Sequence, residues 1–315
     1  MFVKGKKLLI FLTIFFLLSF FYIDFKLSNF EKDVRNEIIK MRIFRYILVI
    51  TSGMVLTSSG AVMQILFKNP LLDSYVLGIS GGGLFGFILS SVYFKGNLLI
   101  SIFFSFFFSL LSALISLSFS SNIKSDRKVS ILISGLLVNI LFSSLVIILS
   151  IFSKRDITFL FYALMGSFNH IFISKNFFLY ISFFVTIILT TVFIIFKSKE
   201  LDIISIDEDI ASTSGVNVKK NFFFILLIII YQTSLIVSFV GMVGFVGIII
   251  PNILRMAGVV KSKDLISGSF LGGASLILVA DFISKYSFSF EIPIGVVLSL
   301  FSLPFIFWIV KNNFE

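Results

Sequence analysis

Few side chains in this chain could carry out covalent chemistry or bind a metal. The sequence contains no cysteine, which excludes thiol nucleophiles and thiolate metal sites, and a single histidine, His170, excludes a histidine-rich metal site. Three adjacent glycines, Gly81–Gly83, are a feature of phosphate-binding loops, but the sequence GxxxxGK-S/T occurs nowhere. We therefore expect these glycines to pack helices closely. We expect no catalytic residue, no metal ligand and no cofactor on this chain.

Charged side chains close to apolar runs are the remaining candidates for function. Asp281 and Glu291 lie near the ends of two such runs, where ionisable groups are often functional. We expect each of them to pair with Lys285 or to cap backbone groups, and not to bind a proton or a substrate. Arg42 and Arg45 precede an apolar run, a position in which arginines can anchor a helix at the membrane interface.

The longest polar segment between two apolar runs covers residues 200–220. Ser205 and Glu208 have the spacing of a capping box, in which the two residues satisfy backbone donors reciprocally. Gly215 can end a helix in a left-handed conformation. The pattern predicts a short helix over about 206–214 with an exposed apolar face, which favours docking on a soluble partner over a solvated linker. The residues expected to make this contact are Ser205, Ile206, Glu208, Ile210 and Gly215.

The composition defines the environment that must position these residues. Hydrophobic residues make up 58% of the 315 residues and charged residues 13%, whereas soluble domains contain roughly a quarter charged residues. The mean hydropathy is +1.10. The net charge of +10 comes from Lys and Arg in short groups between apolar runs, which is typical of membrane orientation and not of nucleic-acid binding. The sequence therefore indicates an all-α integral membrane protein in contact with lipid.

The apolar runs predict about ten transmembrane helices. Residues 8–23 lack a small-residue cleavage site, so we expect an uncleaved first span. The run 221–254 would form a helix of about 50 Å against a hydrocarbon core of about 30 Å, so it must fold back near its glycines and Pro251. An even number of spans places both termini on one side, in the cytoplasm. The spans are expected near 8–23, 46–66, 75–94, 98–119, 129–151, 177–196, 221–240, 244–258, 265–283 and 293–310.

The segment Ser58–Gly83 interrupts two of these runs with polar residues and glycines. Pro70 lacks a backbone donor and restricts the residue before it, so a helix that runs through Leu66 should end near Asn69. Because both flanks are long enough to cross a bilayer, we expect a short turn between two spans.

Short motifs follow one another in a fixed order after the first predicted span. They are Arg42-x-x-Arg45, SGAVMQ, KNPL-x-D, LGIS-G, ISGLLVN at 133–139, MGSF at 165–168, IDEDIA at 206–211, GFVGIIIPNILR at 244–255 and EIPIGVV at 291–297. With these motifs the chain resembles the permease subunits of ABC importers for ferric siderophores, haem and cobalamin. The resemblance implies a type II importer permease, with residues 1–315 as a single transmembrane domain. Phe44 and Asn252 depart from the family pattern, which usually has proline and histidine there.

The resemblance also implies partners and residue roles. The expected assembly contains a second permease subunit, as a homodimer, two cytoplasmic ATPases that bind ATP and Mg, and an extracytoplasmic binding protein that delivers the chelate. Arg42, Arg45 and Lys285 would receive acidic residues of the binding protein. The helix 206–214 would be the element that couples the ATPases to the spans. The expected location is the bacterial inner membrane.

The resulting prediction is a non-enzymatic transport subunit for a metal chelate, with a ferric siderophore as the expected cargo and haem or cobalamin as alternatives. An ion-coupled secondary transporter is a different class, and the scarcity of charge inside the spans argues against it. A membrane enzyme would need clustered nucleophiles, metal ligands or carboxylates within the spans, and the sequence shows none.

Overall fold

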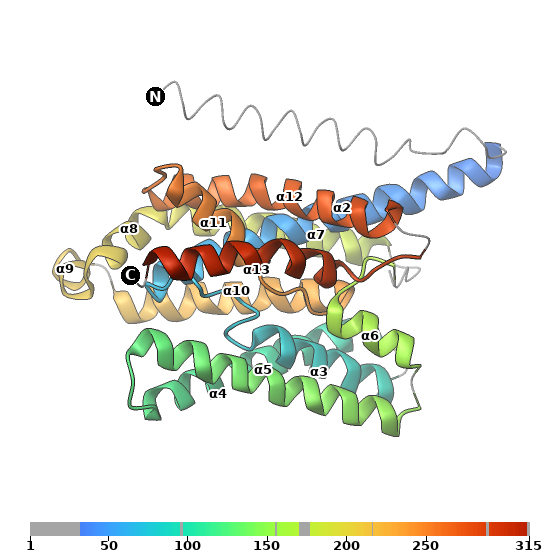
Figure 1. The fold of residues 1–315 in the computed structure, drawn as a ribbon, viewed down its shortest axis with the longest axis horizontal. Helices are drawn as coiled ribbons and strands as arrows, with labels where there is room; N and C mark the ends of the chain where they lie inside the picture. The colour runs from blue at the N-terminus through green and yellow to red at the C-terminus, as the bar shows by residue number, and fades with distance from the viewer. Residues whose placement is uncertain are drawn as a thin grey trace.

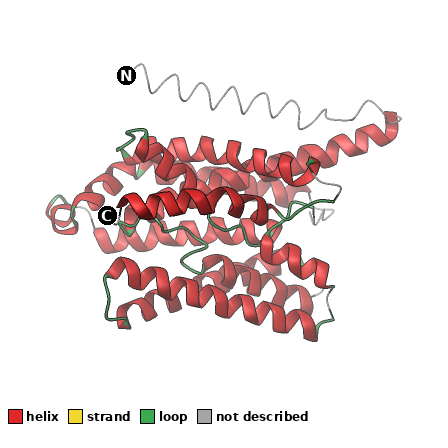
Figure 2. Cartoon of the chain, viewed as in Figure 1, coloured by secondary structure: helices red, strands yellow, loops and turns green. Residues whose placement is uncertain are grey.

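The computed structural model describes residues 32–94, 97–154, 156–169, 177–215, 217–287 and 290–313. These residues form helices joined by loops, and most of the helices lie side by side along one direction (Figures 1 and 2). The helices are α2 (Lys32–Leu66), α3 (Ile79–Tyr93), α4 (Leu98–Asn122), α5 (Arg127–Phe152), α6 (Ile157–Met165), α7 (Phe177–Phe196), α8 (Ser198–Ile206), α9 (Glu208–Thr213), α10 (Val218–Val240), α11 (Val246–Met256), α12 (Ser262–Tyr286) and α13 (Ile294–Asn313).

Several helices have the length and composition of membrane spans. Within the described residues, Met41–Leu66 of α2 and the whole of α4, α5, α10 and α12 qualify. Ser182–Phe196 of α7 forms a further candidate together with α8, from which it is bent by 51°. The all-α membrane fold predicted from composition is therefore confirmed. The predicted first span, 8–23, lies outside the described residues.

The run 221–254 folds back as its length requires. Helix α10 ends at Val240, and α11 begins at Val246 after a connection that starts at Gly241 with φ +83°. A Cβ atom at Gly241 would lie 2.4 Å from the backbone oxygen of Ala163, so this position needs glycine for space as well as for its left-handed conformation. The 11-residue α11 is too short to cross a bilayer and forms a half-helix inside the bundle.

Helix α2 ends as its proline predicts. The last helical residue is Leu66, and residues 67–78, which we call the elbow, lead to α3. Lys68 adopts φ +50°, and the backbone N–H of Asn69 donates to the oxygen of Gln64 at 3.1 Å. Helix α3 starts only at Ile79 and has 15 residues, so it is shorter than the predicted span.

Small residues bring α3 and α4 into close contact. Five serines of α4 are at most 1% exposed, and we call them the serine stripe: Ser101, Ser105, Ser109, Ser112 and Ser116. Ser109 and Ser112 donate to the backbone oxygens of Ile79 and Gly78 at 3.0 and 2.5 Å. A Cβ atom at Gly86 would lie 2.2 Å from the Phe104 oxygen. Close backbone approach and hydroxyl hydrogen bonds are the usual means of joining helices in lipid.

A second close contact joins α2 to α12. A Cβ atom at Gly53 would lie 2.2 Å from the oxygen of Gly273, and Thr57 Oγ1 donates to the oxygen of Ser269 at 2.6 Å. Helix α10 contacts both α2 and the α3–α4 pair. The tightly packed α2 and α12 therefore hold the charged groups described next in fixed relative positions.

Candidate functional site

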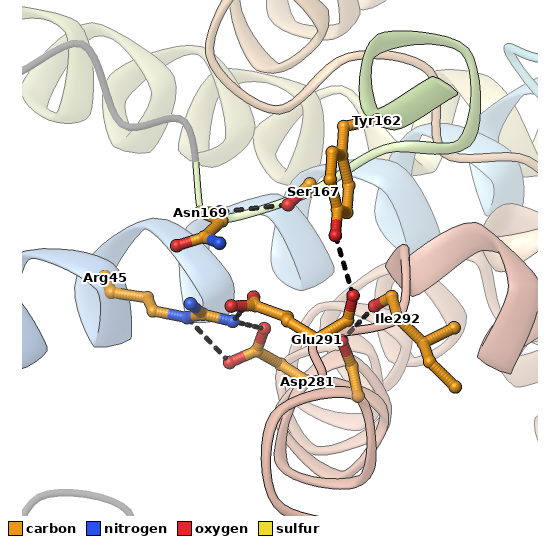
Figure 3. A network of polar contacts seen from close by, with 8 residues as sticks. Arg45, Tyr162, Ser167, Asn169, Asp281, Glu291 and Ile292 are labelled. Carbon is orange, nitrogen blue, oxygen red and sulfur yellow. Dashed lines mark hydrogen bonds and ion pairs between the residues drawn. The ribbon is translucent and has the colours of Figure 1, made fainter. Parts of the chain in front are cut away.

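A cluster of five charged residues lies where the C-terminal end of α12 packs against the N-terminal half of α2. We call it the Arg45 cluster, and its members are Arg42, Arg45, Asp281, Lys285 and Glu291. Arg45 is 6% exposed and donates from Nε and Nη2 to the two oxygens of Asp281 at 3.2 and 2.7 Å. Its Nη2 also donates to Glu291. Figure 3 shows the guanidinium between the two carboxylates. This bidentate geometry suits a planar guanidinium and orients it firmly.

The sequence predicts that Asp281 and Glu291 pair with Lys285 or cap backbone groups. The structure pairs both of them with Arg45, a partner that the sequence did not indicate. Arg45 and Asp281 are 236 residues apart, so only the packing of α2 on α12 brings them together. Lys285 lies one turn beyond Asp281 on α12, with Nζ 5.2 Å from the ring centre of Tyr286.

The three predicted docking residues thus lie at the same end of the bundle, but they differ in access. Arg42 and Lys285 are half-buried, whereas Arg45 is buried against carboxylates of its own chain. The expectation that Arg45 meets acidic residues of another protein stays a prediction. It requires those residues to reach a guanidinium that already has two acidic partners.

The cluster is also connected to α6 through the chain between α12 and α13. The Tyr162 hydroxyl donates to the backbone oxygen of Glu291 at 2.9 Å, as Figure 3 shows. Two residues beyond Ile292, the N–H of Ile294 donates to the oxygen of Gly166 at 3.0 Å. Helix α6 was not predicted from the sequence, and its nine residues give only a short apolar run.

The elbow and α11 form a second polar site in the middle of the fold. Pro251 in α11 has no N–H, so the oxygen of Gly247 loses its partner within the helix. Gln64 Nε2 of α2 donates to that oxygen at 3.0 Å. Arg255 Nη1 donates to the other end of the same amide, Oε1 of Gln64. Gln64 therefore repairs the backbone defect that the proline creates.

The elbow itself also makes contacts that fix α11. Asn252 Nδ2 donates to the oxygens of Pro70 and Ile248, each at 2.8 Å. Asp73 is 2% exposed, and its carboxylate accepts the N–H of Val76 at 2.8 Å together with backbone N–H groups at the start of α11. A carboxylate suits the positive end of a helix dipole. Asn252 therefore stabilises the conformation of the elbow directly, through the hydrogen bond from its side-chain amide to Pro70.

The segment expected to contact a soluble partner lies at the opposite end of the bundle, where α9 projects in Figure 1. The structure corrects its local geometry. Ser205 is in the last turn of α8 and donates to the oxygen of Asp202 at 2.7 Å, so it does not cap the next helix. Helix α9 starts at Glu208 and ends at Thr213, within the predicted 206–214. The capping box was wrong because α8 extends further than the polar composition suggested.

Other features of this segment agree with the sequence. Gly215 adopts φ +82°, the left-handed conformation expected at the end of the helix. Ile206 is 71% exposed at the junction of α8 and α9. The side chains of Glu208 and Ile210 lie outside the part of the chain that the structure describes.

Helix α8 attaches this segment to the spans. Leu201 and Ile204 are at most 2% exposed, and Asp202 Oδ1 accepts the backbone N–H of Ser262 at the start of α12 at 2.7 Å. Lys68 Nζ of the elbow donates to the oxygen of Ile206 at 3.5 Å. Helix α8 therefore contacts both α12 and the elbow, next to the start of α9.

A multi-pass helical bundle with a broken span at its centre is typical of membrane transport proteins. The model of the FecCD transport family matches residues 8–312. The chain belongs to this family, and it is an ABC importer permease.

Curated relatives and solved structures agree with this assignment. The vitamin B12 import system permease proteins BtuC of Salmonella paratyphi A and Salmonella newport are each 29% identical over 279 residues, which is 87% of this chain and 83% of theirs. An ABC transporter assigned to the metal-chelate type, solved in an inward-facing conformation, aligns with a TM-score of 0.81 at 25% identity, over 98% of this chain and 99% of that one. PsaBC from Streptococcus pneumoniae, in complex with Fab, shares the fold with a TM-score of 0.62 at 24% identity, over 86% and 91%.

Proposed function

We propose that this chain is the permease of an importer for a metal chelate. A binding protein outside the cell would deliver the chelate, a second copy of the permease would complete the pathway, and two ATPases in the cytoplasm would drive transport. The observation that supports this proposal best is the family match together with the positions of the Arg45 cluster and the α8–α9 segment. The Arg45 cluster and the α8–α9 segment lie at opposite ends of α2 and α12, as two soluble partners on opposite sides of a membrane require.

The proposed orientation places the Arg45 cluster outside the cell and both termini in the cytoplasm. Carboxylates of the binding protein would pair with the half-buried Arg42 and Lys285, and with the more deeply buried Arg45. Fixed cationic groups steer the approach of acidic surfaces and select them over other surfaces. Ser205, Ile206, Glu208, Ile210 and Gly215 would form the ATPase contact. The exposed side chain of Ile206 and the link from α8 to α12 support this role.

For the cargo, we propose a ferric siderophore as the first candidate. Cobalamin is the second, and a specific observation favours it, because the relatives named above are vitamin B12 permeases. Haem is the third candidate.

Uptake measurements test the function and separate the cargoes. Cells that lack their own chelate importers would express the chain with its ATPase and binding protein, and would be given labelled ferric siderophore, haem or cyanocobalamin. We expect ATP-dependent uptake of one chelate class. Uptake without the ATPase would support the secondary transporter, and the absence of uptake for all three chelates would contradict the proposal.

A further inference from the structure

The two carboxylates that hold Arg45 are not equivalent. Asp281 uses both oxygens, and its side chain is 1% exposed. Glu291 uses one oxygen, its side chain is 15% exposed, and it lies in the connection between α12 and α13 and not in a helix. A bidentate pair on two packed helices is harder to separate than a single contact from a loop. Glu291 is therefore the more accessible and the less firmly held partner of Arg45.

The backbone of Glu291 is joined to α6 by a hydrogen bond. Its oxygen accepts the Tyr162 hydroxyl, and three residues later Ile294 donates to Gly166. A Cβ atom at Gly295, in the first turn of α13, would lie 2.3 Å from the oxygen of Met165, so the start of α13 is packed closely against the end of α6. The backbone around Glu291 is therefore in direct contact with α6 and the residue that follows its last turn.

The end of α6 is in turn bound to the break between α10 and α11. Met242 donates to the oxygen of Ala163 at 3.0 Å, and Ser167 donates to the oxygen of Val240 at 2.8 Å. These are backbone hydrogen bonds on both sides of Gly241, the point at which the span folds back. A continuous path of packed groups thus joins Arg45, Glu291, α6 and the broken span.

The charges of the cluster leave it able to attract one more carboxylate. Arg42, Arg45 and Lys285 supply three positive charges, and Asp281 and Glu291 supply two negative charges, so the cluster has a formal charge of +1. An acidic side chain that approaches from solution meets Glu291 first, because Asp281 is buried.

We propose that an acidic side chain of the binding protein takes the place of Glu291 on Arg45 while Asp281 stays in place. This inference rests on the proposed function. Glu291 and Tyr162 are then positioning residues: Glu291 holds the α12–α13 connection closed until docking, and Tyr162 passes its release to α6 and to the break at Gly241. Arg45 contacts the binding protein only after this exchange.

The first test replaces Glu291 in the complete assembly of permease, ATPases and binding protein, reconstituted in nanodiscs. E291Q keeps the size of the side chain but removes the charge that competes with the incoming carboxylate. We expect the binding-protein concentration for half-maximal ATPase stimulation to fall about two- to fivefold, the range of a partly exposed ion pair. D156N is the matched control, because Asp156 is an exposed carboxylate beside α6. It should leave this concentration unchanged.

The second test separates docking from transmission. Y162F removes the hydroxyl that holds the Glu291 oxygen, so binding-protein affinity should be unchanged while maximal stimulation falls about fivefold, as expected for one lost hydrogen bond. A merely structural role would change both quantities together. Y93F is the control, since Tyr93 is 69% exposed at the end of α3.

A distance measurement tests the inference independently of ATP hydrolysis. The chain has no cysteine, so S287C and I157C can carry two spin labels, on the α12–α13 connection and at the start of α6. We expect the binding protein to shift the distance in the otherwise unaltered chain, and E291Q alone to shift it in the same direction.

Three results overturn the inference: equal behaviour of E291Q and D156N, loss of affinity in Y162F, or a label distance that neither docking nor E291Q changes. Failure of the proposed function gives a different result. In that case the assembly with the unaltered permease would show no stimulation by the binding protein at all.

Discussion

At the scale of single residues, Arg45 is the group whose surroundings say most about its role. A guanidinium that is 6% exposed in an apolar bundle is stable only with its charge compensated, and Asp281 and Glu291 provide that compensation. Its burial means that a substitution there reports on folding as well as on docking. A test of docking must therefore use other residues.

Replacing Arg45 should destabilise the bundle strongly. R45Q leaves Asp281 buried without its cation, which costs about 3–5 kcal/mol. We expect a lower unfolding midpoint in detergent, measured by loss of helical circular dichroism. R45Q with D281N should recover part of the loss, because the unpaired charge is then absent. If the single and double variants unfold at the same point, the two residues are not coupled.

At the scale of helices, the close contact between α3 and α4 depends on glycine residues, which have no side chain to keep the two backbones apart. G86A would place a methyl group 2.2 Å from the Phe104 oxygen, and the backbone there cannot move independently of the serine stripe. We expect a loss of about 1–3 kcal/mol in stability, measured as a lower aggregation temperature. G268A is the control, because its methyl group meets only the flexible end of Leu254. Equal losses would argue against a close-packed interface.

The sequence was sufficient for the elements whose cause is local. The end of α2 before Pro70, the break after Val240 and the left-handed Gly215 all follow from proline, glycine or chain length. It was insufficient for contacts that need packing, such as Arg45 with Asp281 or Gln64 with the Gly247 oxygen. The presence of Pro251 was a usable signal for the latter contact, since every proline inside a helix leaves one oxygen to be satisfied.

At the scale of the whole molecule, docking should depend on the accessible cations of the Arg45 cluster. R42E with K285E should raise the binding-protein concentration for half-maximal ATPase stimulation about tenfold or more, with a strong dependence on salt. K154E, an exposed charge reversal at the same end of the bundle, is the matched control. An unaltered concentration in the double variant would remove the docking role.

Coupling at the other end should depend on the integrity of α9. The N–H of Ala211 donates to the oxygen of Asp207 at 3.1 Å, so A211P removes a hydrogen bond and breaks the helix, whereas A211G keeps the donor. We expect A211P to reach the membrane at normal levels but to lose uptake linked to ATP hydrolysis, with most uptake retained in A211G. Normal uptake in A211P would exclude α9 as the coupling element.

The repair of Pro251 by Gln64 also determines which parts of the molecule can change their relative positions. If α11 moved away from α2, the Gly247 oxygen, the Gln64 amide and Arg255 would all lose partners at once, away from water. The two helices are therefore expected to travel as one rigid block. Because backbone hydrogen bonds on both sides of Gly241 also hold this break against the end of α6, a change of access to the pathway would have to move α2, α11 and α6 together.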